Sequence, residues 1–163
     1  MITTSISIDF LKRLYAMPTW AAMEYAFSNH FVPVRTVIDY AKSKLTAGDG
    51  ENPDEEFIAS AVVDESIAES VHRLAEKEGD SSEDELRLFW ANVFLAWAYE
   101  HRSDFQDFLG VVEEIYTDFD YPSELAEFVR YMPTNAPDLG SREANENRMI
   151  ASMGRYVAEY IQS

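Results

Sequence analysis

Hydrophobic residues recur at every third or fourth position along most of this chain, which is the period of an amphipathic helix. The pattern is strongest over residues 81–101, where two tryptophans and two phenylalanines fall on one broad apolar stripe. Ser82 stands three residues before Glu85, the spacing of a capping box. We expect this segment to be the central core helix, because an aromatic stripe at helical spacing is more often core than a ligand site.

The same period predicts shorter helices before and after this segment. They span residues 7–15, 20–28, 34–45, 54–63, 66–78, 103–119, 124–131 and 142–161. Residues that favour helix ends support these boundaries, since Thr19, Ser103 and Ser141 stand at predicted starts and Asn29 and Gly79 at predicted ends.

Signals for β-strands are scarce. Asp49 and Gly50 are not flanked by alternating apolar and polar positions, so residues 47–53 predict a loop and not a hairpin. Residues 132–140, with two prolines and a glycine, predict a second loop. We therefore expect an all-α protein, with residues 1–163 forming a single compact domain of about eight helices. An antiparallel helical bundle and an irregular array of α-hairpins are both compatible with the short connections.

The formal net charge of -17 is spread unevenly along the chain. Residues 1–50 carry four acidic and five basic side chains (net +1), residues 51–100 fourteen and three (net -11), and residues 101–163 twelve and five (net -7). Nucleic acid and anionic membranes are not expected as partners, because both bind proteins of the opposite charge. The charge favours a basic protein partner, with simple solubility as the alternative.

The composition indicates a folded protein, since 47% of residues are hydrophobic and 13% aromatic. The chain has no cysteine, which excludes disulfides, thiolate metal ligands and cysteine nucleophiles. Residues 1–20 lack the features of a signal peptide, and no apolar run reaches the roughly 18 residues of a membrane span. We expect a soluble cytoplasmic protein.

Motifs that carry catalytic chemistry are missing from the chain: it has no nucleophile elbow, no phosphate loop and no dinucleotide fingerprint. Glu69 and His72 match Glu-x-x-His, half of the motif of di-iron carboxylate bundles, but the second copy is missing. We expect no enzyme activity, no cofactor and no metal. A metal-dependent enzyme with carboxylate and histidine ligands inside a helical bundle is the alternative.

Residues 113–133 alternate acids with aromatic residues across a predicted break between two helices. We expect Phe119, Phe128 and Tyr131 to pack inside, which leaves acids and a tyrosine around the break. Tyrosine gives rigid contact area and carboxylates bind arginine or lysine, so this segment is a candidate binding surface. An ordinary helix–helix corner is the alternative. The candidate partner-binding residues are Glu113, Glu114, Asp118, Asp120, Tyr121 and Glu124.

Several blocks of the chain resemble a bacterial family, domain of unknown function 2247. They are residues 7–11 (SIDFL), 36–41 (TVIDYA), 113–122 (EEIYTDFDYP) and 128–133 (FVRYMP). The resemblance covers nearly the whole chain and implies a small single-domain bacterial protein. It also suggests an immunity protein, because some relatives are encoded near toxin systems. It gives no functional residues to transfer.

The expected function is therefore a protein-interaction module. The leading hypothesis is an immunity protein that binds and occludes a basic cognate bacterial toxin domain. A metal-dependent enzyme and an acidic scaffold or adaptor remain as alternatives, and the sequence leaves the oligomeric state open.

Overall fold

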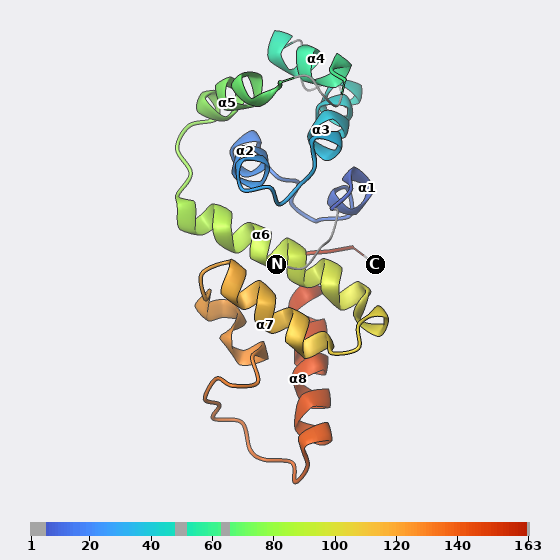
Figure 1. Ribbon diagram of the computed structural model, residues 1–163, viewed down its shortest axis with the longest axis vertical. Helices are drawn as coiled ribbons and strands as arrows, with labels where there is room; N and C mark the ends of the chain where they lie inside the picture. The colour runs from blue at the N-terminus through green and yellow to red at the C-terminus, as the bar shows by residue number, and fades with distance from the viewer. Residues whose placement is uncertain (1–5, 48–51, 63–65, 163) are drawn as a thin grey trace. The chain divides into compact units, whose positions relative to one another are not determined.

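The computed structural model describes residues 6–47, 52–62 and 66–162. Within these ranges the chain forms eight α-helices, two short 3-10 helices and no β-strand (Figure 1). The α-helices are α1 (Ile8–Leu11), α2 (Trp20–Ser28), α3 (Val34–Thr46), α4 (Pro53–Ser60), α5 (Ala68–Lys77), α6 (Glu83–Glu100), α7 (Phe108–Asp118) and α8 (Arg142–Val157). The 3-10 helices are η1 (Arg102–Asp104) and η2 (Ser123–Phe128). The all-α class predicted from the sequence is confirmed.

Contacts divide the chain into two compact units. The N-terminal unit ends at Leu86 and holds α1 to α5. The C-terminal unit begins at Arg87 and holds most of α6, then α7, η2 and α8. The boundary falls inside α6, which runs across it as one helix. That residues 1–163 make up a single domain stays a prediction.

In the N-terminal unit, α3 packs against α4, and α5 packs against both α2 and α4. Trp20 and Tyr40 meet edge to face with their ring centroids 4.8 Å apart. The Trp20 Nε1–H donates to Glu55 at 2.9 Å, and the Tyr40 hydroxyl donates to the Pro18 carbonyl at 2.5 Å. Both polar atoms of this aromatic pair are thus satisfied, as burial requires. Further fully buried side chains are Ile6, Leu11, Met23, Val37, Ile38, Ile58 and Val71.

The first turn of α2 is held by side chains from two parts of this unit. Thr19, predicted as its N-cap, accepts a hydrogen bond from the Ala22 N–H at 3.1 Å. The Glu78 carboxylate at the end of α5 accepts from the Trp20 and Ala21 N–H groups at 3.0 and 3.1 Å. A carboxylate at a helix N-terminus satisfies unpaired donors and complements the helix dipole. This contact joins the start of α2 to the end of α5.

In the C-terminal unit, η2 packs against both α7 and α8. The predicted core helix supplies the central part of this unit's core, since most of α6 beyond its first turns is buried. Its fully or nearly fully buried residues are Trp90, Ala91, Asn92, Val93, Phe94, Leu95, Ala96 and Ala98. Phe94 meets Phe119 at 5.4 Å, and the Tyr156 hydroxyl of α8 donates to Asn92 at 2.7 Å. Gly154 of α8 lies so close to Tyr99 that a Cβ there would collide with the Tyr99 hydroxyl.

The helix predicted over residues 103–119 begins later than expected, at Phe108. Ser103 lies in η1, and the N-cap is Asp107, whose carboxylate accepts from the Gly110 N–H at 3.1 Å. Serine and aspartate are both favourable N-caps, although only Ser103 was predicted as one. The structure uses the second of them.

Four other predicted helices are shorter in the structure, among them the last, which was predicted to reach Ile161 and ends at Val157. The first ends at Leu11, and the fourth ends at Ser60, while its predicted end at Val63 lies outside the described residues. The segment predicted as a helix over residues 124–131 is the 3-10 helix η2, which ends at Phe128. Residues 48–51 of the first predicted loop are also outside the described ranges.

The helices of the described residues are not of the kind that spans a membrane. None of them combines the length and the apolar character that crossing a bilayer requires.

Candidate functional site

The predicted partner-binding residues lie where α7 ends and η2 begins. The Tyr121 N–H donates to the Tyr116 carbonyl at 2.8 Å, and the Asp120 N–H donates to the Thr117 carbonyl at 3.1 Å. These two bonds form a Schellman motif, which requires a left-handed residue just after the helix. Asp120 takes that conformation with φ 59°, and Tyr121 repeats it with φ 57°.

Two successive left-handed residues without glycine are an unusual backbone, and each costs of order 1–3 kcal/mol. Here the conformation presents an aromatic side chain to solvent. Tyr121 is 55% exposed. Its ring packs edge to face with the ring of the buried Tyr116, and the two centroids are 5.3 Å apart. Tyr131, which is 60% exposed, approaches the same Tyr116 ring at 6.5 Å. Two exposed tyrosines therefore rest on one buried tyrosine.

We call this region the α7–η2 corner. It consists of Tyr116, Asp118, Asp120, Tyr121, Glu124 and Tyr131. Phe119 and Phe128 are buried as predicted, but the prediction that Tyr131 packs inside is wrong. A helix over residues 124–131 would have placed Phe128 and Tyr131 on one face. Because η2 ends at Phe128, helical spacing no longer relates the two side chains.

Five of the six predicted binding residues lie on the surface. They are Glu114, Asp118, Asp120, Tyr121 and Glu124. The Asp120 carboxylate lies 3.5 Å from Arg87, and Asp120 remains 73% exposed, so this ion pair adds little stability. Glu124 accepts a hydrogen bond from the Ser123 hydroxyl at 3.3 Å. Asp118, Asp120 and Glu124 are exposed and lie within three residues of Tyr121 in the sequence.

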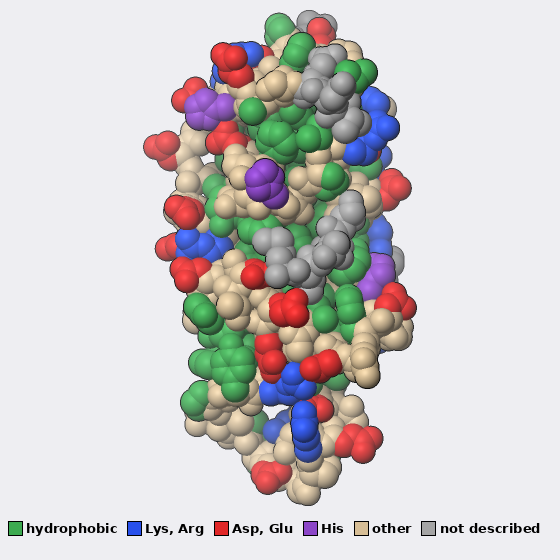
Figure 2. All heavy atoms as spheres, viewed as in Figure 1, with side chains coloured by type: hydrophobic (Ala, Val, Ile, Leu, Met, Phe, Trp, Pro, Cys, Tyr) green, Lys and Arg blue, Asp and Glu red, His purple; other side chains and the backbone are tan. Residues whose placement is uncertain are grey.

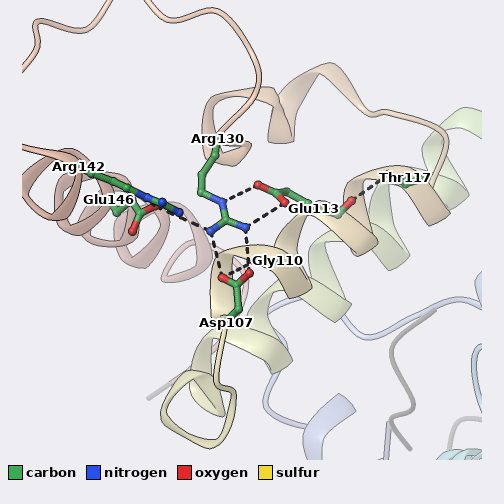
Figure 3. A network of polar contacts seen from close by, with 7 residues as sticks. All are labelled: Asp107, Gly110, Glu113, Thr117, Arg130, Arg142 and Glu146. Carbon is green, nitrogen blue, oxygen red and sulfur yellow. Dashed lines mark hydrogen bonds and ion pairs between the residues drawn. The ribbon is translucent and has the colours of Figure 1, made fainter.

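Glu113, the sixth residue, takes part in an ion-pair network (Figure 3). Arg130, which follows η2, donates from Nε to Glu113 at 2.7 Å and from Nη2 at 3.1 Å. The same guanidinium donates to both carboxylate oxygens of Asp107, each at 3.1 Å. Glu113 therefore fastens α7 to the segment after η2, and its carboxylate is engaged by Arg130.

The electrostatics of this network match its geometry. The hydrogen bonds from Arg130, followed by that from the Gly110 N–H, lower the pKa of Asp107 below its usual 3.8. Glu113, followed by Asp107, raises the pKa of Arg130. Arg130 also lies 3.9 Å from Glu146 of α8, which pairs with Arg142 at 2.9 Å. One arginine thus links α7, η2 and α8.

A hollow of about 1050 Å³ lies between α8 and the segment that follows η2. Figure 2 shows basic side chains gathered beside it. Four arginines line it, and we call it the arginine hollow: Arg130, Arg142, Arg148 and Arg155. The loop that forms one wall is fixed to α8, because Asn145 donates to Asp138 and accepts from the Leu139 N–H, both at 2.9 Å.

The alternative metal site is not assembled around Glu69 and His72. Glu69 pairs with Arg73 at 3.0 Å, while His72 lies 2.7 Å from Glu24 and 3.3 Å from Glu76. Across residues 6–47, 52–62 and 66–162, no three or more His, Asp or Glu side chains are arranged to hold a metal ion. The contacts of Glu69 and His72 are those of surface ion pairs.

Three features of this region were not predicted from the sequence: the role of Arg130, the exposure of Tyr131 and the arginine hollow. The partners of Arg130 lie 17 and 23 residues away, so spacing alone does not indicate them. A signal for the hollow did exist, because Arg148 and Arg155 are seven residues apart and so share one face of a helix.

The fold and the site define an all-helical protein with an exposed acidic and aromatic corner. The chain belongs to the bacterial family DUF2247, described as an uncharacterized protein conserved in bacteria, whose family model matches residues 8–161. The resemblance noted from the sequence is thereby confirmed. Comparison with curated proteins and with solved structures found no match.

Proposed function

We propose that this protein is a cytoplasmic protein-interaction module. It would be an immunity protein that uses the α7–η2 corner to bind and occlude a basic toxin domain. The observation that carries the proposal is the exposed side chain of Tyr121. Tyr121 and the preceding Asp120 are two successive left-handed residues at the end of α7. Strained backbone that presents a large side chain to solvent is more common at binding and catalytic sites than elsewhere.

The chemistry of the corner suits a basic protein surface. Tyrosines supply rigid contact area and are enriched among residues that dominate binding energy. Asp118, Asp120 and Glu124 would engage lysine or arginine around Tyr121. The net charge of -17 would also speed association with a basic partner. A nuclease toxin is basic because it must hold an anionic backbone, and an acidic inhibitor competes for the same surface.

Binding to a basic toxin domain encoded beside this gene, measured by calorimetry at low and high salt, tests the proposal. The double variant Asp118→Lys, Glu124→Lys should weaken binding by at least about tenfold, and salt should weaken binding of the wild type. The matched control is Asp80→Lys, Glu159→Lys, which changes the charge equally at exposed residues outside the corner.

Equal weakening by both double variants would reduce the effect to net charge and reject the corner as the binding surface. Affinity that does not change with salt would reject electrostatic occlusion and favour the scaffold or adaptor alternative.

A further inference from the structure

The arginine hollow lies apart from the residues of the proposed partner surface, except that Tyr131 borders both. We propose that it is a binding site for a small organic phosphate, with the phosphate group held by Arg148, Ser152 and Arg155. This inference does not depend on the proposed function.

Two of the four arginines are already engaged by carboxylates. Arg130 binds Asp107 and Glu113, and Arg142 binds Glu146. The other two retain donors. Within the described residues, the hydrogen bond of the Arg148 side chain goes to the Pro137 carbonyl at 2.5 Å, and the Arg155 side chain makes none. The hollow therefore holds two guanidinium groups with donors available for a ligand.

The acids that line the hollow accept no hydrogen bond from these two arginines in the described structure. Glu113 and Glu146 are engaged by Arg130 and Arg142, and Asp138 accepts from Asn145 and the Gly140 N–H, each at 2.9 Å. The hydrogen bonds from Asn145 and from the Gly140 N–H, and last the charge of Arg148, lower the pKa of Asp138, but Arg148 donates no hydrogen bond to it. Glu127 is the remaining acid of the lining. Arg148 and Arg155 thus keep donors for a ligand, and the two lining carboxylates without an arginine hydrogen bond are Asp138 and Glu127.

The helix dipole explains one of these positions and not the other. Arg155 lies in the last turn of α8, where a cation is favourable. Arg148 lies in the middle of α8, where that effect is absent. A dipole effect alone therefore does not account for both arginines on this face.

Three residues of α8 that line the hollow carry donors suited to a phosphate group. Arg148, Ser152 and Arg155 all line the hollow, and their separation places Arg148 and Arg155 about 10 Å apart along the helix axis. Ser152 lies between them along the helix. A phosphate monoester carries nearly two charges and three acceptor oxygens, which matches two guanidinium groups and a hydroxyl. A carboxylate has one charge, which a single arginine satisfies.

The rest of the hollow suits the organic part of such a ligand. Tyr131, Ala136 and Met149 contribute apolar surface to the lining, and the volume is that of a small-molecule site. The acidic net charge does not prevent binding, because charges farther away than about 8 Å are largely screened at physiological ionic strength. The nearest guanidinium groups therefore decide the local attraction.

Calorimetric titration of the full chain with phenyl phosphate, inorganic phosphate and benzoate tests this site. We expect saturable binding of phenyl phosphate, weaker binding of inorganic phosphate and no binding of benzoate. The variant Arg148→Gln, Arg155→Gln should weaken phenyl phosphate binding by at least about tenfold. Arg35→Gln, an exposed arginine of the N-terminal unit, is the control with the same type of change and should leave the affinity unchanged.

Arg155→Gln alone guards against misfolding, because this side chain has no hydrogen bond to lose in the described structure. It should weaken phenyl phosphate binding severalfold with an unchanged melting temperature. Absence of saturable phenyl phosphate binding overturns the proposal. Equal affinity for benzoate, or equal weakening by Arg35→Gln, does so as well.

Discussion

The helices α2 and α7 end with the same pattern of backbone hydrogen bonds. After α2, the Phe31 N–H donates to the Ala26 carbonyl at 2.8 Å, and after α7, the Tyr121 N–H donates to the Tyr116 carbonyl at 2.8 Å. In both places an aromatic ring follows the turn and contacts the last turns of its own helix. The ring centroids of Phe31 and Tyr25 are 6.0 Å apart, and those of Tyr121 and Tyr116 are 5.3 Å apart.

The two aromatic residues differ in their surroundings. Phe31 is 7% exposed and belongs to the core of the N-terminal unit, whereas Tyr121 is 55% exposed. Each follows a left-handed residue, His30 with φ 60° or Asp120 with φ 59°, but Tyr121 is itself left-handed and Phe31 is not. The same local motif thus yields a core residue at one helix end and a surface residue at the other. The difference is one reason to read the end of α7 as a binding site.

Truncating the two rings tests this contrast with the largest expected effect. Phe31→Ala should lower the free energy of unfolding by about 3–5 kcal/mol, because it opens a cavity in the core. Tyr121→Ala should cost about 1 kcal/mol, which corresponds to one edge-to-face contact. Urea denaturation of both variants measures this. Phe31→Leu is the control and should cost less than about 1.5 kcal/mol. Equal costs at the two positions would place Tyr121 in the core and remove the basis of the proposed surface.

The comparison extends to the helix starts, since Glu78 holds the start of α2 and Asp107 the start of α7. Arg130→Gln should lower the free energy of unfolding by about 1.5–3 kcal/mol, because it deprives Asp107 and Glu113 of charge-assisted hydrogen bonds. Arg142→Gln is the matched control. Its pair with Glu146 is four residues away on one helix and its side chain is 81% exposed, so about 0.5 kcal/mol is expected. Chemical denaturation compares the two variants, and similar losses would show that the Arg130 network has no special structural role.

A glycine at the left-handed positions sharpens the comparison further. His30→Gly should raise the free energy of unfolding by about 1 kcal/mol, because glycine adopts positive φ without the steric cost of a Cβ. Tyr121→Gly should be closer to neutral, since relief of strain is offset by the lost contact with Tyr116. It should nevertheless abolish binding of a basic partner, if the partner surface is as proposed. Thermal unfolding and calorimetry measure both effects. Gly79→Ala, at φ 90°, should be destabilising and serves as the control.

The smallest expected effect is a difference in pH dependence between the two regions. Glu24 of α2, through a hydrogen bond and its charge, and then Glu76 raise the pKa of His72 above 6.5. The resulting stabilisation is fully present below pH 6.5 and is lost as the pH rises through the raised pKa. Arg130 lowers the pKa of Asp107 below 3.8, so that contribution is present above pH 3.8 and is lost as the pH falls through the lowered pKa.

Melting temperatures across this pH range measure the difference. His72→Gln should flatten the decline above pH 6.5 and leave the acid-side decline unchanged, whereas Asp107→Asn should flatten the acid-side decline only. A decline above pH 6.5 that persists in His72→Gln would assign it to other groups.

The sequence allowed most helices to be predicted, because their boundaries depend on nearby residues. Both predicted N-caps form: Ser82 accepts a hydrogen bond from the Glu85 N–H at 3.1 Å, and Ser141 accepts one from the Ala144 N–H at 3.1 Å. Gly79 follows α5 with φ 90°, as its place at the predicted stop required. The helix predicted over residues 103–119 begins later because its N-cap is Asp107, and the helix predicted over residues 124–131 is η2, which ends at Phe128.

The residues of the candidate site were predicted in part. The break after α7 and its exposed acids follow from the local run of Asp, Tyr and Pro, so spacing and composition indicate them. Engagement of Glu113 by Arg130 depends on a contact between segments 17 residues apart, and exposure of Tyr131 depends on where η2 ends. Neither is a property of a short stretch of sequence.

By itself, the sequence determined the helical class, the main caps and the excess of acidic charge, since each depends on residue type and on spacing within a few turns. The tertiary structure alone decided which aromatic residue after a helix becomes core, as Phe31 does, and which becomes surface, as Tyr121 does. It also decided which of the arginines find carboxylates. Burial and ion pairing depend on which distant segments meet in space, and no local pattern specifies that.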